Sequence, residues 1–266
     1  MHESSLSLLC DPETRDPLRL GTDALVNPKS GRCYPLREGI PVFIEAASGL
    51  NRKYQQMYDR IAPGYDLADR LGRFYLWLKR EEDYRQGLIN ELELPSAGRV
   101  LEVSIGTGLN VPYFPVGVGV FGLDLSWGML KKCRKNLIKW KRTAELLQGE
   151  GERLPFKDDS FDAVLHVGGI NFFNDRAQAI REMVRVVRPG AKIVIVDETE
   201  KAVKGGYEKT PLIEGYFKGR DKAVRCPIDL VPPGMPEVQA DELFGGRIYR
   251  LSFRKPRITC PSPPPW

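Results

Sequence analysis

The stretch from Val100 to Leu109 constrains the fold more than any other part of this chain of 266 residues. It is an apolar strand that carries a carboxylate, Glu102, and runs into a Gly-x-Gly turn at Gly106 and Gly108. Such a turn lets a ligand approach bare backbone, as happens where dinucleotide-binding folds seat a pyrophosphate. The stretch therefore predicts an α/β sheet with a ligand at the carboxyl end of this strand.

The same turn does not suit a dinucleotide. The third glycine of the dinucleotide fingerprint is replaced by Val111, and Glu102 would repel a doubly negative pyrophosphate. The carboxylate would instead attract an ammonium group, so a cofactor with an amino-acid end, such as S-adenosylmethionine, is favoured. Asp124 ends a second apolar strand at the interval expected for a carboxylate that binds ribose hydroxyls. The two acids are therefore expected to flank one ligand.

In their order along the chain, these motifs resemble the class I S-adenosylmethionine-dependent methyltransferases, in particular the quinone-biosynthesis branch. The resemblance covers residues 53–199 and a final strand near 248–255. The segment 58–66 is similar to the helical segment that lies over the cofactor in that branch, and the loop at 149–162 is similar to the one that holds the adenine. The resemblance implies these cofactor-binding residues: Tyr65, Glu102, Gly106, Thr107, Gly108, Asp124, Leu125, Glu150 and Gly151.

Alternating strands and helices imply an α/β fold, a Rossmann-like, mainly parallel seven-stranded sheet with helices on both faces. The strands that we expect are 99–103, 119–124, 145–148, 162–167, 192–197 and 248–254, and the helices of the core are 127–139 and 175–186. The predicted organisation is a β-rich module at 1–46, a methyltransferase domain at 47–255 and a proline-rich tail at 256–266. Within the domain we expect a helical lid at 51–94, a core at 97–199, a substrate cap at 200–245 and a final strand at 247–254.

The first 46 residues resemble the zinc-ribbon-like module found in some methyltransferases and in their small activator protein. Intact modules of this kind enclose zinc with two Cys-x-x-Cys pairs. Glu13 and Ser30 interrupt those pairs here and leave Cys10 and Cys33 as the only thiols of the module. We therefore predict a degenerate, metal-free module. The apolar residues expected to pack inward are Ile40, Val42 and Phe43.

Methyl transfer asks mainly that the nucleophile and the methyl group be oriented and that water be excluded, so a general base is optional. His166 is the candidate catalytic base, because it ends the fourth strand and a histidine titrates near neutrality. Packing in the core is the alternative interpretation of this residue. The candidate substrate contacts are Asn171, Phe172 and Tyr216.

Charge and composition limit the partners and the cellular compartment that we expect. The formal net charge is +5, and a basic run at 131–142 has apolar residues at helical spacing, which indicates a solvated helix face more than a nucleic-acid footprint. The five cysteines form no paired framework, and no apolar run reaches membrane-spanning length. We expect a cytoplasmic protein with a small-molecule substrate and without a disulfide or a membrane span. A nucleic-acid partner is the disfavoured alternative.

Three functions are compatible with these motifs. The leading hypothesis is a methyltransferase that transfers the methyl group by in-line displacement to a carbon or oxygen of a small organic acceptor. Residues 168–173 do not carry the Asn/Asp-Pro-Pro-aromatic motif of enzymes that methylate base amino groups, which disfavours that chemistry. The alternatives are an RNA methyltransferase and a non-catalytic protein that binds the cofactor or activates a partner.

Overall fold

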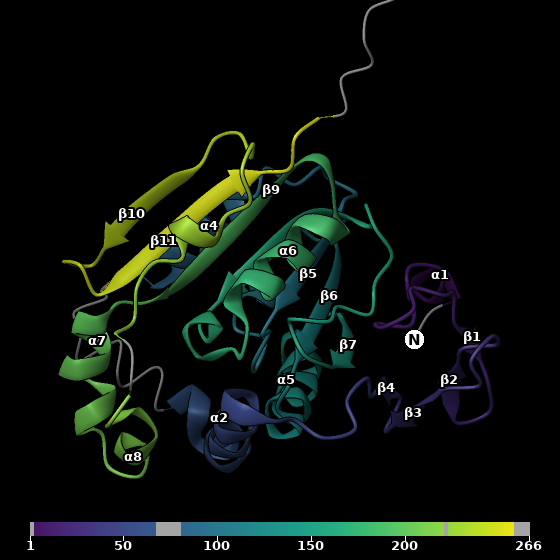
Figure 1. Ribbon diagram of the computed structural model, residues 1–266, viewed down its shortest axis with the longest axis horizontal. Coiled ribbons are helices and arrows are strands. Elements are labelled where there is room, and N and C mark those ends of the chain that lie inside the picture. The colour runs from purple at the N-terminus through teal and green to yellow at the C-terminus, as the bar shows by residue number, and fades with distance from the viewer. Residues whose placement is uncertain (1–2, 68–80, 221–222, 258–266) are drawn as a thin grey trace, which may run out of the picture.

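A seven-stranded sheet runs through the centre of the protein, in a computed structural model that describes residues 3–67, 81–220 and 223–257 (Figure 1). The strand order is β10-β11-β9-β8-β5-β6-β7. The five strands from β9 to β7 are parallel, whereas β10 and β11 are antiparallel to their neighbours. The strands are β5 (Arg99–Val103), β6 (Gly119–Asp124), β7 (Glu145–Gln148), β8 (Phe161–Val167), β9 (Val187–Glu198), β10 (Gln239–Leu243) and β11 (Ile248–Arg254).

Helices cover both faces of this sheet because successive strand residues point to opposite sides. Leu101 and Val103 belong to a buried cluster with α6 (Arg176–Val186), while Val100 belongs to another with α4 (Glu81–Glu91) and α5 (Trp127–Trp140). The shorter helices and turns are α1 (Glu3–Leu6), α2 (Gly49–Ile61), η1 (Ala62–Gly64), η2 (Val111–Tyr113), η3 (Ile170–Phe172), α7 (Glu200–Gly205), η4 (Tyr207–Lys209), α8 (Glu214–Phe217) and η5 (Ile228–Leu230). The predicted fold class is confirmed, and all six predicted strands are present.

Within the predicted cap at 200–245, residues 239–243 form the edge strand β10, which the sequence did not predict. All the residues of β10 are exposed except Leu243, which is half-buried. The strand therefore has no alternation of apolar and polar residues, and periodicity could not reveal it. Residues 258–266 of the predicted tail and 68–80 of the predicted lid lie outside the described residues.

The N-terminal module is a four-stranded antiparallel sheet in the order β1-β2-β3-β4. Its strands are β1 (Arg19–Leu20), β2 (Ala24–Val26), β3 (Cys33–Arg37) and β4 (Ile40–Pro41). Ile40 and Phe43 are buried, as expected, and Val42 is half-buried. The module lies beside β7 in Figure 1, where the backbone N–H of Phe43 donates to the carbonyl of Gln148 at 2.8 Å. The sheet edge at β7 is thus covered by the chain's own N-terminus.

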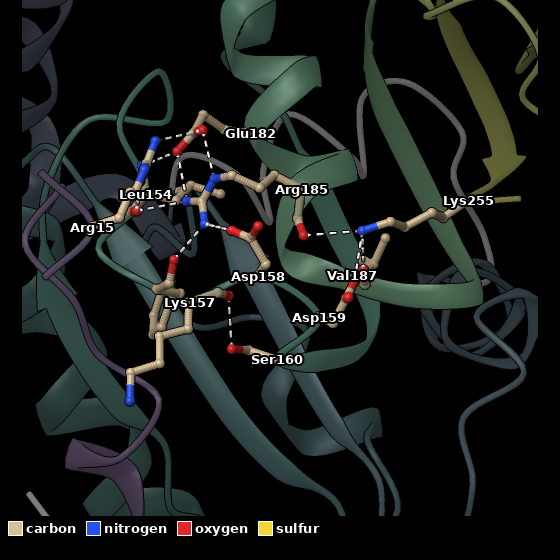
Figure 2. A network of polar contacts seen from close by, with 11 residues as sticks. Arg15, Leu154, Lys157, Asp158, Asp159, Ser160, Glu182, Arg185, Val187 and Lys255 are labelled. Atoms are coloured by element: carbon tan, nitrogen blue, oxygen red, sulfur yellow. Dashed lines mark hydrogen bonds and ion pairs between the residues drawn. The ribbon is translucent and has the colours of Figure 1, made fainter. Parts of the chain in front are cut away.

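Polar contacts tie the module to α6 and to the loop that follows β7. Arg15 donates to the carboxylate of Glu182 at 2.8 Å and to the carbonyl of Leu154 at 3.0 Å. Arg185 donates to the same two groups, and Figure 2 shows both arginines against the Glu182 carboxylate. Glu182 is buried, so a second guanidinium compensates its charge where water is excluded.

Hydrogen bonds connect the two segments of the module that would carry the Cys-x-x-Cys pairs in an intact zinc ribbon. The side-chain N–H of Asn27 donates to Asp11 Oδ2 at 2.8 Å, and both side chains are buried. The other Asp11 oxygen accepts the backbone N–H groups of Glu13 and Thr14. Within the described residues, no group of three or more His, Cys, Asp or Glu side chains is arranged to hold a metal ion. The zinc-ribbon relationship and the domain boundaries remain predictions.

The basic face of α5 is partly engaged within the chain. Lys132 lies 3.4 Å from Asp66, and Arg134 pairs with Glu38. These contacts support the interpretation of this run as a helix face. In the part of the chain that the structure describes, no helix combines the length and apolar character needed to cross a membrane.

Candidate functional site

A cavity opens at the carboxyl ends of the parallel strands, where loops diverge and side chains from several strands meet. We divide its wall into two parts. The β5–β7 side comprises the lining residues at and after the carboxyl ends of β5, β6 and β7, together with Arg85 of α4. The β8–β9 side comprises the lining residues at and after the carboxyl ends of β8 and β9, together with the tyrosines of α2 and of the turn that follows it. The lining residues used below are Tyr54, Tyr58, Tyr65, Arg85, Glu102, Gly106, Thr107, Asn110, Asp124, Leu125, Glu150, Gly151, Glu152, Gly168, Gly169, Phe172, Glu198 and Tyr207.

Glu102 is the most deeply buried acid of the β5–β7 side, with 1% of its surface exposed. Its Oε1 accepts a hydrogen bond from Asn110 Nδ2 at 2.6 Å, and its Oε2 is buried without a hydrogen-bond partner. Asn110 in turn accepts a hydrogen bond from the guanidinium of Arg85. Burial raises the pKa of Glu102 to about 8. A buried carboxyl group and a guanidinium group therefore stand on either side of a shared amide.

The two glycines of the turn have different tasks. Gly106 and Gly108 have φ angles of +57° and +80°, a backbone region that favours glycine. A Cβ atom on Gly106 would meet nothing closer than a carbonyl oxygen at 4.0 Å, whereas one on Gly108 would lie 2.7 Å from the Cys133 sulfur of α5. Gly106 lines the cavity, and Gly108, expected there as well, lies against α5 instead. The contact with α5 accounts for the glycine at position 108, and its assignment to the ligand remains a prediction.

Asp124 joins the turn to the next strand. Its Oδ2 accepts the backbone N–H of Gly106 at 2.7 Å, and its Oδ1 accepts that of Ser126 at 2.8 Å. Burial raises the pKa of Asp124 to about 6, against these hydrogen bonds, which lower it. The carboxylate is thereby fixed at the cavity wall.

The loop after β7 completes this side. The side-chain amide of Asn51, on α2, donates to Glu150 at 3.2 Å and to Glu152 at 3.2 Å. A Cβ atom on Gly151 would lie 2.5 Å from the ring of Phe173, so only glycine fits against that ring. The loop is therefore held between α2 and the segment that follows β8.

In the two Tyr-Asp pairs at 58–59 and 65–66, the tyrosines line the cavity and the aspartates bind to residues of α5 or its N-terminus. Tyr58 and Tyr65 both line the cavity, with ring centroids 6.3 Å apart. Asp59 accepts hydrogen bonds from Ser126 Oγ at 2.6 Å and from the backbone of Gly128 at the start of α5. Asp66 accepts one from Asn136 of the same helix at 2.9 Å. The aspartates thus hold the tyrosines over the cavity.

The β8–β9 side is aromatic. Phe172 stacks on Tyr54 of α2 with ring centroids 4.4 Å apart. Tyr207 donates its hydroxyl hydrogen bond to the carboxylate of Glu198, which ends β9. Gly168 and Gly169 both have positive φ. Because they lack side chains, the cavity wall beside them stays open.

Comparison with known proteins gives consistent results. Residues 101–195 match the profile of a methyltransferase domain family. The chain is 29% identical over 231 residues to a demethylmenaquinone methyltransferase of Desulfitobacterium hafniense, covering 76% of this chain and 90% of the relative. It is 31% identical to a ubiquinone/menaquinone biosynthesis C-methyltransferase of Syntrophotalea carbinolica, covering 61% of this chain and 65% of that relative. The chain is a class I S-adenosylmethionine-dependent methyltransferase.

Solved structures agree with this methyltransferase in fold. An S-adenosylmethionine-dependent methyltransferase of Thermotoga maritima has a TM-score of 0.55 and 23% identity, covering 76% of this chain and 99% of that one. The cyclase SpnF has a TM-score of 0.59 and 14% identity, covering 80% and 98% of the two chains. Because the fold hosts different chemistries, similarity in fold alone does not identify the reaction.

The cavity of the methyltransferase suits S-adenosylmethionine, its cofactor. The molecule carries a sulfonium, an ammonium and a carboxylate group. Five cavity carboxylates face one guanidinium, that of Arg85, within the described lining, so the wall favours a cationic ligand. The buried Glu102 Oε2 and Thr107 Oγ1 atoms, both without a hydrogen-bond partner, are available to polar groups of such a ligand.

His166 does not lie in the cavity wall of the methyltransferase, and its predicted role as general base is not supported. Its side chain has 0% exposure, and its Nε2 accepts the backbone N–H of Ile170 at 3.0 Å. Burial lowers its pKa to about 3, so the ring is neutral and has no free acceptor nitrogen aimed at a substrate. The histidine packs in the core, because the end of β8 is covered from both faces.

Two of the three predicted substrate contacts also lie outside the described lining. Asn171 donates to the carbonyl of Glu198 and accepts from Tyr249, so it holds β9 and β11 together. The carbonyl of Tyr216 accepts from Tyr54, and its side chain is not in the wall. Phe172 does line the cavity, as predicted.

Sequence analysis missed Arg85, Glu198 and Tyr207. Arg85 shares a helix face with Leu88 and Leu92, and a buried arginine on an apolar face is a signal that could have identified it. Glu198 follows the rule that singled out Glu102, since it is an acid at the carboxyl end of a parallel strand. Tyr207 had no comparable signal.

Proposed function

We propose that the β5–β7 side binds S-adenosylmethionine in an extended order. Glu102 Oε2 accepts from the ammonium group, and Arg85 pairs with the carboxylate of the same amino-acid end. Asp124 accepts from the ribose hydroxyls, while Leu125, Glu150 and Gly151 surround the adenine. The unpartnered Glu102 oxygen beside an arginine supports this assignment, because a zwitterion matches both charges at once.

We further propose that the acceptor is a ring carbon of a reduced quinone, bound on the β8–β9 side. The observation that carries this proposal is the similarity over 90% of a demethylmenaquinone methyltransferase. The rings of Tyr58, Tyr65, Phe172 and Tyr207 provide flat apolar surfaces for an aromatic acceptor. Carbon methylation is the chemistry that the name of the Syntrophotalea carbinolica relative states, and it requires an electron-rich ring such as a quinol.

The cofactor supplies an activated methyl group, so the chain has to orient the acceptor and exclude water. The Phe172–Tyr54 stack and the lining tyrosines cover part of the cavity with aromatic rings. Asp59 and Asp66 hold the helical segment that carries two of these tyrosines. Their contacts with α5 couple closure to the helix that follows Asp124.

The test is methyl transfer from labelled S-adenosylmethionine to a reduced naphthoquinone with an unsubstituted ring carbon. We expect a ring-methylated product by mass spectrometry and NMR. Label on an oxygen atom, or label only in an RNA fraction assayed in parallel, would refute the acceptor assignment. Calorimetry with S-adenosylhomocysteine tests the cofactor assignment separately, and unchanged affinity in Asp124→Ala would refute the ribose contact.

A further inference from the structure

A carboxylate stands on the acceptor side of the cavity and is not needed to bind the cofactor. Glu198 is the last residue of β9, two strands away from Glu102 in the sheet order, and its side chain lines the cavity. The Tyr207 hydroxyl donates to one of its oxygens. That bond and a hydrogen bond between the Glu198 and Asp197 side chains fix the carboxylate in the cavity wall.

The neighbouring acid is already committed to the backbone. Asp197 is buried, and its Oδ2 accepts the N–H groups of Gly169 at 3.1 Å and Asn171 at 3.0 Å. Its Oδ1 accepts the N–H of Glu198 at 2.8 Å. Asp197 therefore shapes the turn after β8, while Glu198 alone of the two faces the cavity.

The groups that surround Glu198 are acids and phenols from four elements. Asp197 precedes it on β9, Tyr207 comes from η4, and Tyr249 from β11 hydrogen-bonds to Asn171 nearby. Tyr58, from α2, is close enough for the charge of Glu198 to raise its pKa, although burial is the larger cause. Arg85, the basic residue in the described lining, is paired with Asn110 on the other side. No cation of the described wall thus competes for the Glu198 carboxylate.

We propose that Glu198, positioned by Tyr207, accepts the hydroxyl proton of the acceptor. The inference rests on the proposed quinol acceptor. The proton moves from the acceptor oxygen to the Glu198 carboxylate, and the electron pair of the broken O–H bond moves into the ring. The ring carbon then forms its bond to the methyl group, whose bonding pair to sulfur stays on sulfur. The proton on that carbon passes to water, its bonding pair restores the aromatic ring and returns the negative charge to the oxygen, and Glu198 gives its proton back to that oxygen. The chemistry needs no oxidant or reductant.

The variant Glu198→Gln tests this step, because glutamine keeps an oxygen that can accept from Tyr207. We expect kcat for the reduced naphthoquinone to fall about 100-fold or more, within the range for loss of a general base, with KM and S-adenosylhomocysteine affinity unchanged. Tyr207→Phe should lose less activity and move the acidic limb of the kcat profile to higher pH, because the carboxylate loses its donor. The exposed Glu45→Gln is the matched control.

A second readout does not need turnover. β-Naphthol is a photoacid that emits as naphtholate only when an acceptor takes its proton. Bound to the S-adenosylhomocysteine complex, it should emit as naphtholate in wild type and Glu45→Gln, and as neutral naphthol in Glu198→Gln. Naphtholate emission and kcat that are both unaffected by Glu198→Gln would overturn the inference, as would neutral emission in wild type. Naphtholate emission that depends on Glu198 without quinol methylation would refute only the proposed function.

Discussion

The two sides of the cavity are built in different ways. The β5–β7 side takes most of its ligand-facing groups from three consecutive strand ends within one stretch of sequence, and backbone N–H groups fix Asp124 there. The β8–β9 side gathers aromatic rings from α2, η3 and η4, which are far apart in the chain. On the proposed assignment, the cofactor shared by the fold is bound by the strand ends, whereas the acceptor that differs between enzymes is bound by the helical segments above them.

The sharpest test of this division is Glu102→Gln, with two ligands compared. S-Adenosylhomocysteine should bind roughly 10- to 150-fold more weakly, which corresponds to the loss of about 1.5–3 kcal/mol for a hydrogen bond to a charged group. 5′-Methylthioadenosine lacks the amino-acid end and should bind equally to both proteins. Calorimetry measures both affinities. An equal loss for the two ligands would show that Glu102 supports the wall and does not contact the amino group.

Arg85→Met probes the other charge of the same pair. We expect about a tenfold loss of S-adenosylhomocysteine affinity, since one charge-assisted pair with the ligand carboxylate is removed. Binding of 5′-methylthioadenosine should again be unchanged, and Asp124→Ala should weaken both ligands. A ligand-independent loss in Arg85→Met would mean that the arginine acts only through Asn110.

Cofactor affinity should depend on pH through Glu102. Burial raises its pKa to about 8 in the unliganded protein, so below that pH the carboxyl must lose a proton before it accepts the ammonium group. Affinity for S-adenosylhomocysteine should rise with pH between 6 and 8, by at most about tenfold per unit, and this slope should vanish in Glu102→Gln. Calorimetry in buffers of different ionisation enthalpy measures the protons released.

The same raised pKa makes the stability of the unliganded fold fall with rising pH, whereas cofactor affinity rises. Between the unfolded value of 4.5 and about 8, the folded protein keeps a proton on Glu102 that the unfolded chain releases. Its contribution to stability is therefore full below that window and is lost as pH rises through it. Urea unfolding of wild type and Glu102→Gln across this range should diverge with rising pH.

The smallest effect is expected for His166→Gln on the β8–β9 side. Glutamine can still accept the Ile170 N–H, so kcat should stay within about threefold of wild type, far from the loss expected for a general base. Methyl transfer at several pH values measures this. A loss of kcat comparable with that of Glu198→Gln would mean that His166 takes part in the reaction, and would contradict the assignment of the general base to Glu198 alone.

The limits of sequence reasoning follow the same division. Apolar runs that alternate with helical segments located the parallel strands, and the acids in β5 and β6 were identified because an apolar run and its end are local properties. The sequence does not separate Gly106 from Gly108, because only the position of Cys133 on α5 distinguishes their surroundings. Tyr207 reaches the cavity through tertiary packing, which no local pattern encodes. The exposed strand β10 lacked a pattern altogether.

The docking of the N-terminal module has a consequence for how the chain matures on the ribosome. Leu9 pairs with Phe156, and Arg15 binds Glu182, so the partners of the first segment are synthesised long after it. Contacts of such high sequence separation form late, because the intervening loop must first be ordered. The earliest residues to emerge should therefore wait, unpaired, until α6 has left the exit tunnel. Exposed apolar side chains such as Leu9 and Leu25 would in that interval depend on chaperones for protection.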